Sequence, residues 1–205
     1  MIDMKIVLAS RNKHKVEELQ ALLKKHIPTV HVLSLDDIGF DAEIAENGNT
    51  FADNAFIKAE TVAKLGFIGV GDDSGLCVSA LNGEPGVYSA RYAGGHGDDN
   101  ANNALLLENL KNKDDRSAKF VCAVACAFPD CREKNFCVSG TVEGVILEER
   151  RGKDGFGYDP LFYYEPFGKT FAEMSADEKN TVSHRAVAIE KLALKLKELK
   201  TESEK

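Results

Sequence analysis

The fold class is decided by a stretch near the start of the chain, residues 5–33, KIVLASRNKHKVEELQALLKKHIPTVHVL. Its first part, residues 5–9, is an apolar run that predicts a buried strand. From about residue 13 to 25, apolar side chains recur at spacings of three and four, which predicts an amphipathic helix. The apolar face of that helix consists of Val16, Leu19, Leu22 and Leu23. Residues 30–33 predict a short second strand, so the stretch predicts a strand–helix–strand unit typical of α/β proteins.

The rest of the chain adds helices and a long hairpin to this unit. Thr50 and Asp53 match a capping box, which predicts a second helix reaching about Lys64. The further predicted elements are a buried strand at 67–70, a helix at 98–111, hairpin strands at 118–128 and 135–148, and a helix at 183–199. Together they predict an α/β fold with a central mixed sheet. We expect a single domain over residues 1–200 and a disordered polar tail over 201–205.

Composition and charge exclude some classes of protein. The chain has 205 residues, 43% of them apolar, and a net charge of −7. An acidic chain is poorly suited to hold a nucleic acid polymer, which requires many Lys and Arg contacts to phosphates. The longest uncharged apolar run, residues 120–128, is far shorter than the ~20 residues of a membrane-spanning helix. The first residues lack the apolar core of a signal peptide, so we expect a cytoplasmic protein with no membrane partner.

Five cysteines raise the question of a metal site or disulfides. Cys122 and Cys126 share one face of a predicted strand but lie roughly 13 Å apart at the rise of an extended chain. They are too far apart to bind one metal ion easily, and the chain contains no CxxC motif. We therefore expect reduced thiols with a packing role.

The first candidate site is the segment from Ser10 to Lys15, SRNKHK, between the first strand and the first helix. Free backbone N–H groups at a helix start favour a bound anion. Ser10 and Asn12 could donate to phosphate oxygens, and Lys15 could add positive charge. The alternative is an ordinary capped surface helix. Basic residues are unfavourable at a helix N-terminus, however, which favours an anion nearby.

The second candidate site is the segment GDDSGL, residues 71–76, at the end of a predicted strand. Neighbouring carboxylates beside an apolar core need a cation or hydrogen-bond donors, and Mg²⁺ prefers one or two carboxylates together with substrate phosphates. The alternative is an Asx-type turn. Because strand side chains alternate, we expect Asp72 and Asp73 to have different roles. Glu46, in a loop before the second helix, is a candidate partner of this site.

The third candidate site lies in the C-terminal third of the chain. Residues 155–160, GFGYDP, place two aromatic side chains in a glycine-flanked loop, which suits stacking on a base. Asp159 could accept hydrogen bonds from a base edge. Lys179 and the segment 183–185, SHR, add basic residues, two of them at another helix start. The alternative is a glycine-rich turn with two packing aromatics.

Taken in order, these motifs resemble the inosine triphosphate pyrophosphatase family, the non-canonical purine NTP pyrophosphatases. The resemblance covers nearly the whole chain and rests on LASRNKHK, ENGNTFADNA, DDSGL, GEPGVYSARYAG, GFGYDP and VSHR. It implies an elongated, two-lobed α/β domain with an active-site cleft between the lobes, forming a homodimer. It also implies a Mg²⁺-dependent enzyme that hydrolyses ITP, dITP and XTP to the nucleoside monophosphate and pyrophosphate.

The resemblance also assigns roles to individual residues. Asp73 would be the general base and a Mg²⁺ ligand, and Glu46 a second ligand. Ala45 stands where some members have an acidic residue, which leaves the ligand set and the role of Asp72 open. The residues matched to substrate contacts are Ser10, Asn12, Lys15, Ser74, Phe156, Gly157, Tyr158, Asp159, Lys179, His184 and Arg185.

Base selectivity requires donors to the 6-oxo edge, which a 6-amino group would leave unpaired. Arg185 and backbone amides near Phe156 are the candidates. Two alternative functions remain open at this point. Maf-like pyrophosphatases also open with a strand ending LAS, but continue Ser-Pro-Arg-Arg and lack DDSGL. A nucleotide-binding sensor could use the same residues without catalysis.

Overall fold

The computed structural model describes residues 4–95 and 97–203, and in this part of the chain the strands form one seven-stranded sheet in the order β2-β1-β3-β4-β5-β6-β7. The strands are β1 (Met4–Leu8), β2 (Val30–Leu33), β3 (Ile68–Val78), β4 (Ser117–Ala127), β5 (Phe136–Ile146), β6 (Phe162–Tyr164) and β7 (Lys169–Thr170). Strand β1 pairs in parallel with β2 and β3, whereas β6 pairs antiparallel with β5 and β7. The predicted α/β class and mixed sheet are therefore confirmed.

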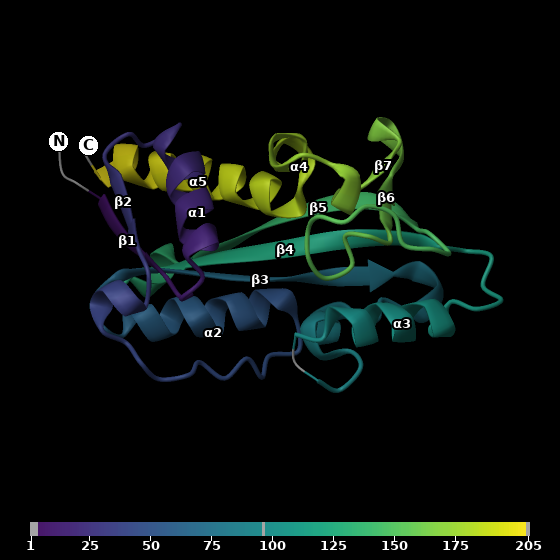
Figure 1. Ribbon diagram of the computed structural model, residues 1–205. Coiled ribbons are helices and arrows are strands. Elements are labelled where there is room, and N and C mark those ends of the chain that lie inside the picture. Colours follow the sequence, from purple (N-terminus) through teal and green to yellow (C-terminus); the bar gives the residue numbers. More distant parts are fainter. Residues whose placement is uncertain (1–3, 96, 204–205) are drawn as a thin grey trace. The chain divides into compact units, whose positions relative to one another are not determined.

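The chain forms two compact units, and β3, β4 and β5 each contribute residues to both. Unit 1 contains residues 1–73, 122–140 and 185–205. It carries the helices α1 (Lys13–Lys24), α2 (Phe51–Ala63) and nearly all of α5 (His184–Ser203). Helices α1 and α5 cover one face of its strands, and α2 covers the other (Figure 1). The α1 and α5 side is a continuous apolar core that includes Ile6, Leu19, Val70, Val124 and Ile189.

Unit 2 contains residues 74–121 and 141–184, with the helices α3 (Asp99–Asn109) and α4 (Ala176–Val182). Its core is rich in aromatic side chains. Phe120 and Phe162 have ring centroids 4.6 Å apart, and Phe171 lies 4.9 Å from Phe162. Leu106 and Leu110, at the end of α3, are fully buried in the same core.

Most predicted elements match the structure within one or two residues because their signals are local. The Thr50–Asp53 capping box is present, with Thr50 Oγ1 accepting from Asp53 N at 3.1 Å and Asp53 Oδ2 accepting from Thr50 N at 3.0 Å. Helix α4, which begins with a capping box of Ser175 and Glu178, was not predicted from the sequence. Among the described residues, none of the helices is long and apolar enough to cross a membrane.

Two sequence predictions are wrong at element ends. The predicted disordered tail continues α5 as far as Ser203, with Thr201 Oγ1 donating to Lys197 O at 3.0 Å, while residues 204 and 205 lie outside the described part. Lys and Glu are good helix formers, so a polar composition did not end the helix. The DDSG segment is neither a strand end nor an Asx-type turn, because β3 runs unbroken from Ile68 to Val78.

The cysteines behave as expected for packing residues. All five are free thiols, and Cys122 and Cys126 are fully buried in the unit 1 core. Burial raises the pKa of Cys126 to about 12, so this thiol stays protonated and unreactive at neutral pH.

Candidate functional site

The loop between β1 and α1 satisfies the backbone of its own helix start. Asn12 is the N-cap of α1, and its Oδ1 accepts from His14 N at 3.0 Å and Lys15 N at 3.3 Å. Ser10 Oγ accepts from Asn12 N at 3.1 Å. Asn12 therefore caps the helix and Ser10 holds the backbone of Asn12, and the phosphate contact predicted for both side chains stays a prediction. The first turn of α1 contains no acidic residue that would repel an anion.

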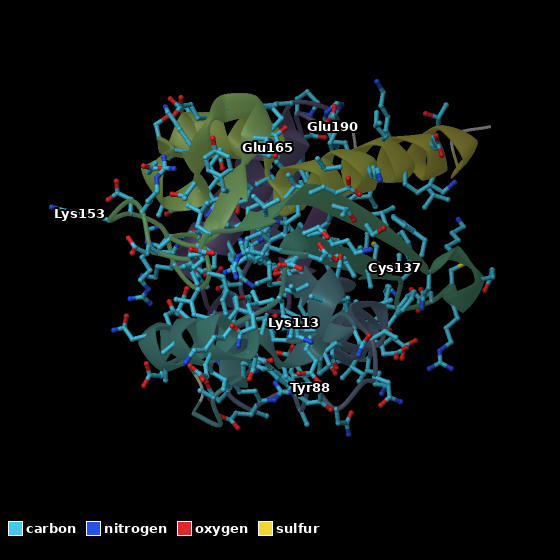
Figure 2. The ribbon with its side chains drawn as sticks, turned by 90° about the vertical axis from the view of Figure 1, so that its right-hand side faces the viewer. Tyr88, Lys113, Cys137, Lys153, Glu165 and Glu190 are labelled. Carbon is cyan, nitrogen blue, oxygen red and sulfur yellow. The ribbon has the colours of Figure 1, made fainter. Side chains whose placement is uncertain are left out.

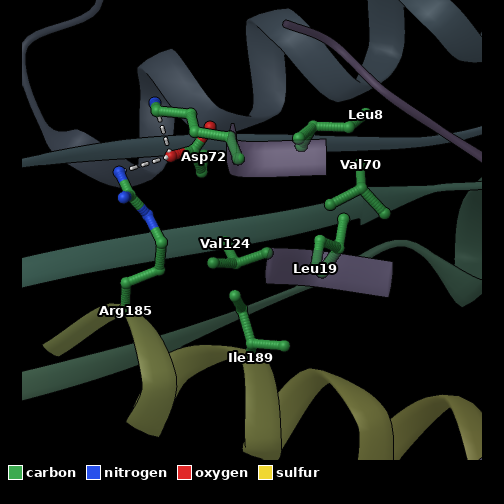
Figure 3. Close-up of a pocket in the computed structure, with 8 residues that line it drawn as sticks. Leu8, Leu19, Val70, Asp72, Val124, Arg185 and Ile189 are labelled. Carbon is green, nitrogen blue, oxygen red and sulfur yellow. Dashed lines mark hydrogen bonds and ion pairs between the residues drawn. The ribbon is translucent and has the colours of Figure 1, made fainter. Parts of the chain in front are cut away.

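Asp72 supplies negative charge that the basic helix starts require. Its Oδ2 accepts from Lys15 Nζ at 2.8 Å and from Arg185 Nη2 at 3.3 Å. Figure 3 shows the pair of Asp72 and Arg185, with Val70, Val124 and other apolar side chains around it. The sequence predicted a bound anion beside the two basic helix starts. In the structure, the carboxylate of Asp72 is an anionic partner for one basic residue at each start, Lys15 and Arg185.

The charges around Asp72 set its protonation state. Burial alone would raise the pKa of Asp72, but the positive charges of Lys15, Arg185 and Lys58 outweigh burial and hold that pKa well below its ordinary value. Asp72 is therefore ionised at neutral pH. Burial would lower the pKa of Arg185, but the nearby negative groups, with Asp72 first among them, together outweigh burial and raise that pKa.

Asp73 points to the opposite face of β3, toward α2. Its Oδ2 accepts from Asn54 Nδ2 at 2.9 Å, and Asn54 Oδ1 accepts from Gly48 N at 2.8 Å. Asn54 is only 1% exposed, so both ends of its amide are fixed. The expectation that Asp72 and Asp73 have different roles agrees with this arrangement, because the alternation of a continuous strand gives them different partners.

Glycines on β3 allow α2 to lie close to the strand. A Cβ on Gly69 would lie 2.1 Å from the carbonyl oxygen of Ala59, and a Cβ on Gly71 would lie 2.2 Å from that of Ala55. Successive residues on this face of β3 therefore lie against successively earlier residues of α2. The next residue on this face is Asp73, which meets Asn54 at the helix start. The glycines therefore position Asn54 against Asp73.

Glu46 lies in the loop before α2 and belongs to the same unit. Its Oε2 accepts from Lys58 Nζ at 2.8 Å, and Lys58 is 8% exposed. In the described part of the chain, no group of three or more His, Cys, Asp or Glu is arranged as a metal cluster. Glu46 and Asp73 provide two carboxylates, a donor set that suits Mg²⁺ when substrate phosphates complete its coordination. The two carboxylates are chemically suited to the cation that the resemblance implies, and their joint binding of it stays a prediction.

Hydrogen bonds from other residues of unit 2 fix the glycine-rich loop of residues 152–158. Asp159 Oδ2 accepts from Phe156 N at 2.9 Å and from Lys179 Nζ at 2.5 Å. Gly157 N donates to Asp99 Oδ2 at 2.7 Å, and Gly157 O accepts from Asn103 Nδ2 at 2.8 Å. These bonds hold the backbone that carries Phe156.

The two aromatic side chains of this loop differ in exposure. Phe156 is 65% exposed, and Lys179 Nζ lies 4.8 Å from its ring centroid. Tyr158 is 3% exposed, and its hydroxyl donates to Ser89 O at 2.9 Å. Burial raises the pKa of Tyr158, so it stays a neutral donor. Phe156 is free to stack on a base, whereas Tyr158 is a core residue. Lys153, in the same loop, points away from the ribbon (Figure 2).

The predicted site residues divide between the two units. Unit 1 holds Ser10, Asn12, Lys15, Glu46, Asp73 and Arg185, and unit 2 holds Ser74, Phe156, Gly157, Tyr158, Asp159, Lys179 and His184. Within unit 1, the small pocket of Figure 3 brings together Lys15 and Arg185 beside Asp72. Asp73 and Glu46 instead contact α2. In unit 2, the His184 ring stacks on Phe120, with centroids 4.9 Å apart.

Sequence reasoning missed several residues that hold the site in place. Asp72 had no assigned role, and Asn54, Lys58, Asp99 and Asn103 were not considered. Asn54 and Lys58 are polar residues among the buried positions of α2, a helix otherwise lined by alanine and valine on that side. A polar residue on an apolar helix face was therefore the signal that could have identified them.

The fold is that of a two-unit α/β protein whose charged side chains gather on both faces of β3. The chain belongs to the Ham1 family, whose model matches residues 6–195. It is 48% identical to the dITP/XTP pyrophosphatase of Clostridium perfringens, a match that covers 94% of this chain and 97% of the relative. It is 50% identical to the dITP/XTP pyrophosphatase of Leuconostoc mesenteroides, and this match covers 94% of this chain and 96% of the relative.

Solved structures agree with this assignment. The Staphylococcus aureus Ham1 protein matches with a TM-score of 0.87 and 42% identity, covering 98% of this chain and all of that chain. A HAM1 protein from Coxiella burnetii matches with a TM-score of 0.89 and 41% identity, and the match covers 95% of this chain and 99% of that chain. The resemblance drawn from the motifs is confirmed, and family membership favours it over the Maf-like alternative.

Proposed function

We propose that this chain hydrolyses the non-canonical purine nucleotides dITP, XTP and ITP to the nucleoside monophosphate and pyrophosphate. Relatives that are 48% and 50% identical over nearly their whole length are named dITP/XTP pyrophosphatases. The observation that carries the proposal is Asp73, a carboxylate on β3 that is oriented by the buried amide of Asn54. Such a fixed, ionisable group is what a general base requires.

The proposed reaction uses the charged groups around β3. Asp73 takes a proton from water, the water oxygen bonds to the α-phosphorus, and the bond from the α-phosphorus to the bridging oxygen breaks. Lys15 stabilises the departing pyrophosphate. An ammonium group has three donors, so Lys15 can keep its bond to Asp72 and still donate to phosphate oxygens. Mg²⁺ held by Glu46 and Asp73 would supply further positive charge to the phosphates.

In unit 2, Phe156 would stack on the purine, and Lys179 beside it would contribute to the same surface. The donors proposed for the 6-oxo edge already have acceptors. Phe156 N donates to Asp159, and Arg185 donates to Asp72. Selectivity through either donor therefore requires that it also reach the base, and Arg185→Ala tests this by the ratio of ITP to ATP turnover.

We further infer a cytoplasmic homodimer that binds no nucleic acid polymer and no membrane. The homodimer follows from the family resemblance, and the absence of polymer binding from a net charge of −7. Analytical ultracentrifugation of the full chain gives the oligomeric state directly, and a monomer at assay concentration would contradict the dimer.

Pyrophosphate release tests the proposed activity. Purified protein is assayed with dITP, XTP, ITP, GTP, TTP and UTP, each with and without Mg²⁺. We expect rapid release from the first three nucleotides, dependent on Mg²⁺, and slow release from the others. Equal turnover of ITP and GTP would contradict the selectivity but not the hydrolysis, and preferred turnover of TTP and UTP would favour a Maf-like activity.

A further inference from the structure

We propose that Asp72 is a positioning residue for this hydrolysis, acting through Lys15 and Arg185. The inference rests on the proposed function, because it concerns how that reaction's basic side chains are held. It assigns to the first carboxylate of the DDSG segment a role distinct from that of Asp73. The two residues are neighbours in sequence but lie on opposite faces of β3.

The geometry brings two helices to one carboxylate oxygen. Asp72 Oδ2 lies 2.8 Å from Lys15 Nζ, on the first turn of α1, and 3.3 Å from Arg185 Nη2, on the first turn of α5. The Asp72 side chain is 8% exposed and that of Arg185 is 14% exposed. Apolar side chains of Leu8, Val70 and other core residues surround the cluster, and weak screening there strengthens each ion pair.

The Oδ2 atom of Asp72 holds two positively charged groups, those of Lys15 and Arg185, close to each other. Without the carboxylate, the ammonium of Lys15 and the guanidinium of Arg185 would repel each other in a poorly screened pocket. Glu18, 3.6 Å from Arg185 Nη1, offsets part of the charge but does not contact Lys15 at ion-pair distance among the described interactions. Arg185 Nε is buried without an acceptor in the described part of the chain. Lys15 therefore depends on Asp72 for its position.

A purely structural role for Asp72 makes a different prediction from a positioning role. If only size and packing matter, asparagine, which has the same shape, should replace aspartate better than glutamate does. If the charge positions Lys15, glutamate should retain more activity, because it keeps the ion pair at the cost of one extra methylene. The comparison of Asp72→Asn with Asp72→Glu thus separates the two roles.

The test is a double-mutant cycle on kcat/KM for dITP with the full chain. We expect about a 100-fold loss for Asp72→Asn, since displacing a catalytic group by about 1 Å costs that order of magnitude, and a smaller loss for Asp72→Glu. On a Lys15→Met background, Asp72→Asn should cost less than about tenfold further, because only the contact with Arg185 then remains to be lost and interacting residues are non-additive. Glu198→Gln is the control, because it removes one carboxylate from an exposed ion pair on α5 and should leave kcat/KM unchanged.

Three outcomes would overturn the inference while leaving the proposed hydrolysis of dITP in place. These are wild-type activity in Asp72→Asn, equal losses on both backgrounds, and full activity in Lys15→Met. If Asp72→Asn is unfolded at the assay temperature by circular dichroism, Asp72→Glu decides, since activity below about one hundredth of wild type in a folded Glu variant would contradict positioning by charge. Absence of dITP turnover in the wild-type chain would instead refute the proposed function.

Discussion

The close approach of β3 and α2 predicts a large effect of adding one methyl group at Gly71. In Gly71→Ala the new Cβ would lie 2.2 Å from the carbonyl oxygen of Ala55 and 2.7 Å from Cβ of Lys58, whereas ordinary contact begins at 3.4 Å. The strand and the helix would therefore have to separate by about 1 Å. The obstacle is backbone, so no side-chain rotation can relieve it.

The magnitude follows from the cost of overpacking a core. Inserted methyl groups cost about 1–3 kcal/mol, and a backbone obstacle places Gly71→Ala near the upper end, at about 3 kcal/mol. For a chain of this size, that loss lowers Tm by about 6–12 °C. The same displacement moves Asn54 away from Asp73, so we expect pyrophosphate release to fall by about 100-fold as well.

Urea unfolding and differential scanning calorimetry measure the stability of Gly71→Ala, with Gly95→Ala as the matched control. A Cβ on Gly95 would meet no heavy atom within 4 Å among the described residues. That control should stay within about 0.5 kcal/mol of wild type. If Gly71→Ala also unfolds within this margin, the close approach does not require glycine, and the account of how α2 positions Asn54 is wrong.

Three other results follow, two from the site and one from the core of unit 1. Asn54→Ala should lower kcat for dITP by about 10- to 100-fold, because Asp73 loses the donor that orients it. The control Asn109→Ala should leave kcat unchanged, and similar kcat values for the two variants would refute the role of Asn54. Phe156→Ala should raise KM for dITP by about tenfold or more through lost stacking, with the unfolding free energy unchanged because the ring is 65% exposed; an unchanged KM would count against stacking. Because burial raises the pKa of Cys126 and of Cys122 to about 12 in the folded protein, the unfolded state releases these protons first, so stability should fall as pH rises above about 9. Urea titrations at pH 8 and 10 measure this fall; Cys126→Ala should reduce the dependence by about half, and an unchanged dependence would count against the role of this thiol.

Local chemistry explains why much of the fold could be predicted. The capping box of Thr50 and Asp53 needs only residues three positions apart, and the helix it opens begins where the sequence indicated. The apolar spacing of α1 likewise reports its buried face directly, with Leu19 and Leu23 in the core. Signals of this kind do not depend on the rest of the chain.

The DDSG segment shows where local reasoning failed. Asp, Ser and Gly favour turns in isolation, so the sequence predicted that the strand ended there. In the structure the strand continues, because Asp72 and Asp73 obtain partners from helices on opposite faces. Lys15 and Arg185 are 57 and 113 positions from Asp72. Contacts over such separations are set by tertiary structure and leave no local signal.

The contacts of the candidate site residues could not be predicted from the sequence. The motifs named Asp73, Lys15 and Glu46 as candidate site residues, which stays a prediction. They did not show that Lys15 contacts the neighbouring carboxylate Asp72, nor that Glu46 contacts the buried Lys58. They also did not separate Phe156, which is exposed, from Tyr158, which is buried. Burial of individual loop side chains depends on packing that the sequence pattern does not encode.

Comparing Asp73→Asn with wild type in both turnover and binding of dITP tests directly whether Asp73 is the general base. Asparagine keeps the size of the side chain and an oxygen that can accept from Asn54, but it cannot take a proton. We predict a loss of kcat of about 10²- to 10⁴-fold, the usual contribution of a general base. Isothermal titration calorimetry with Mg²⁺ present should still detect dITP binding by the variant. Undiminished turnover in Asp73→Asn would contradict the role of Asp73 as general base, and binding without turnover in the wild-type protein would favour a nucleotide sensor instead.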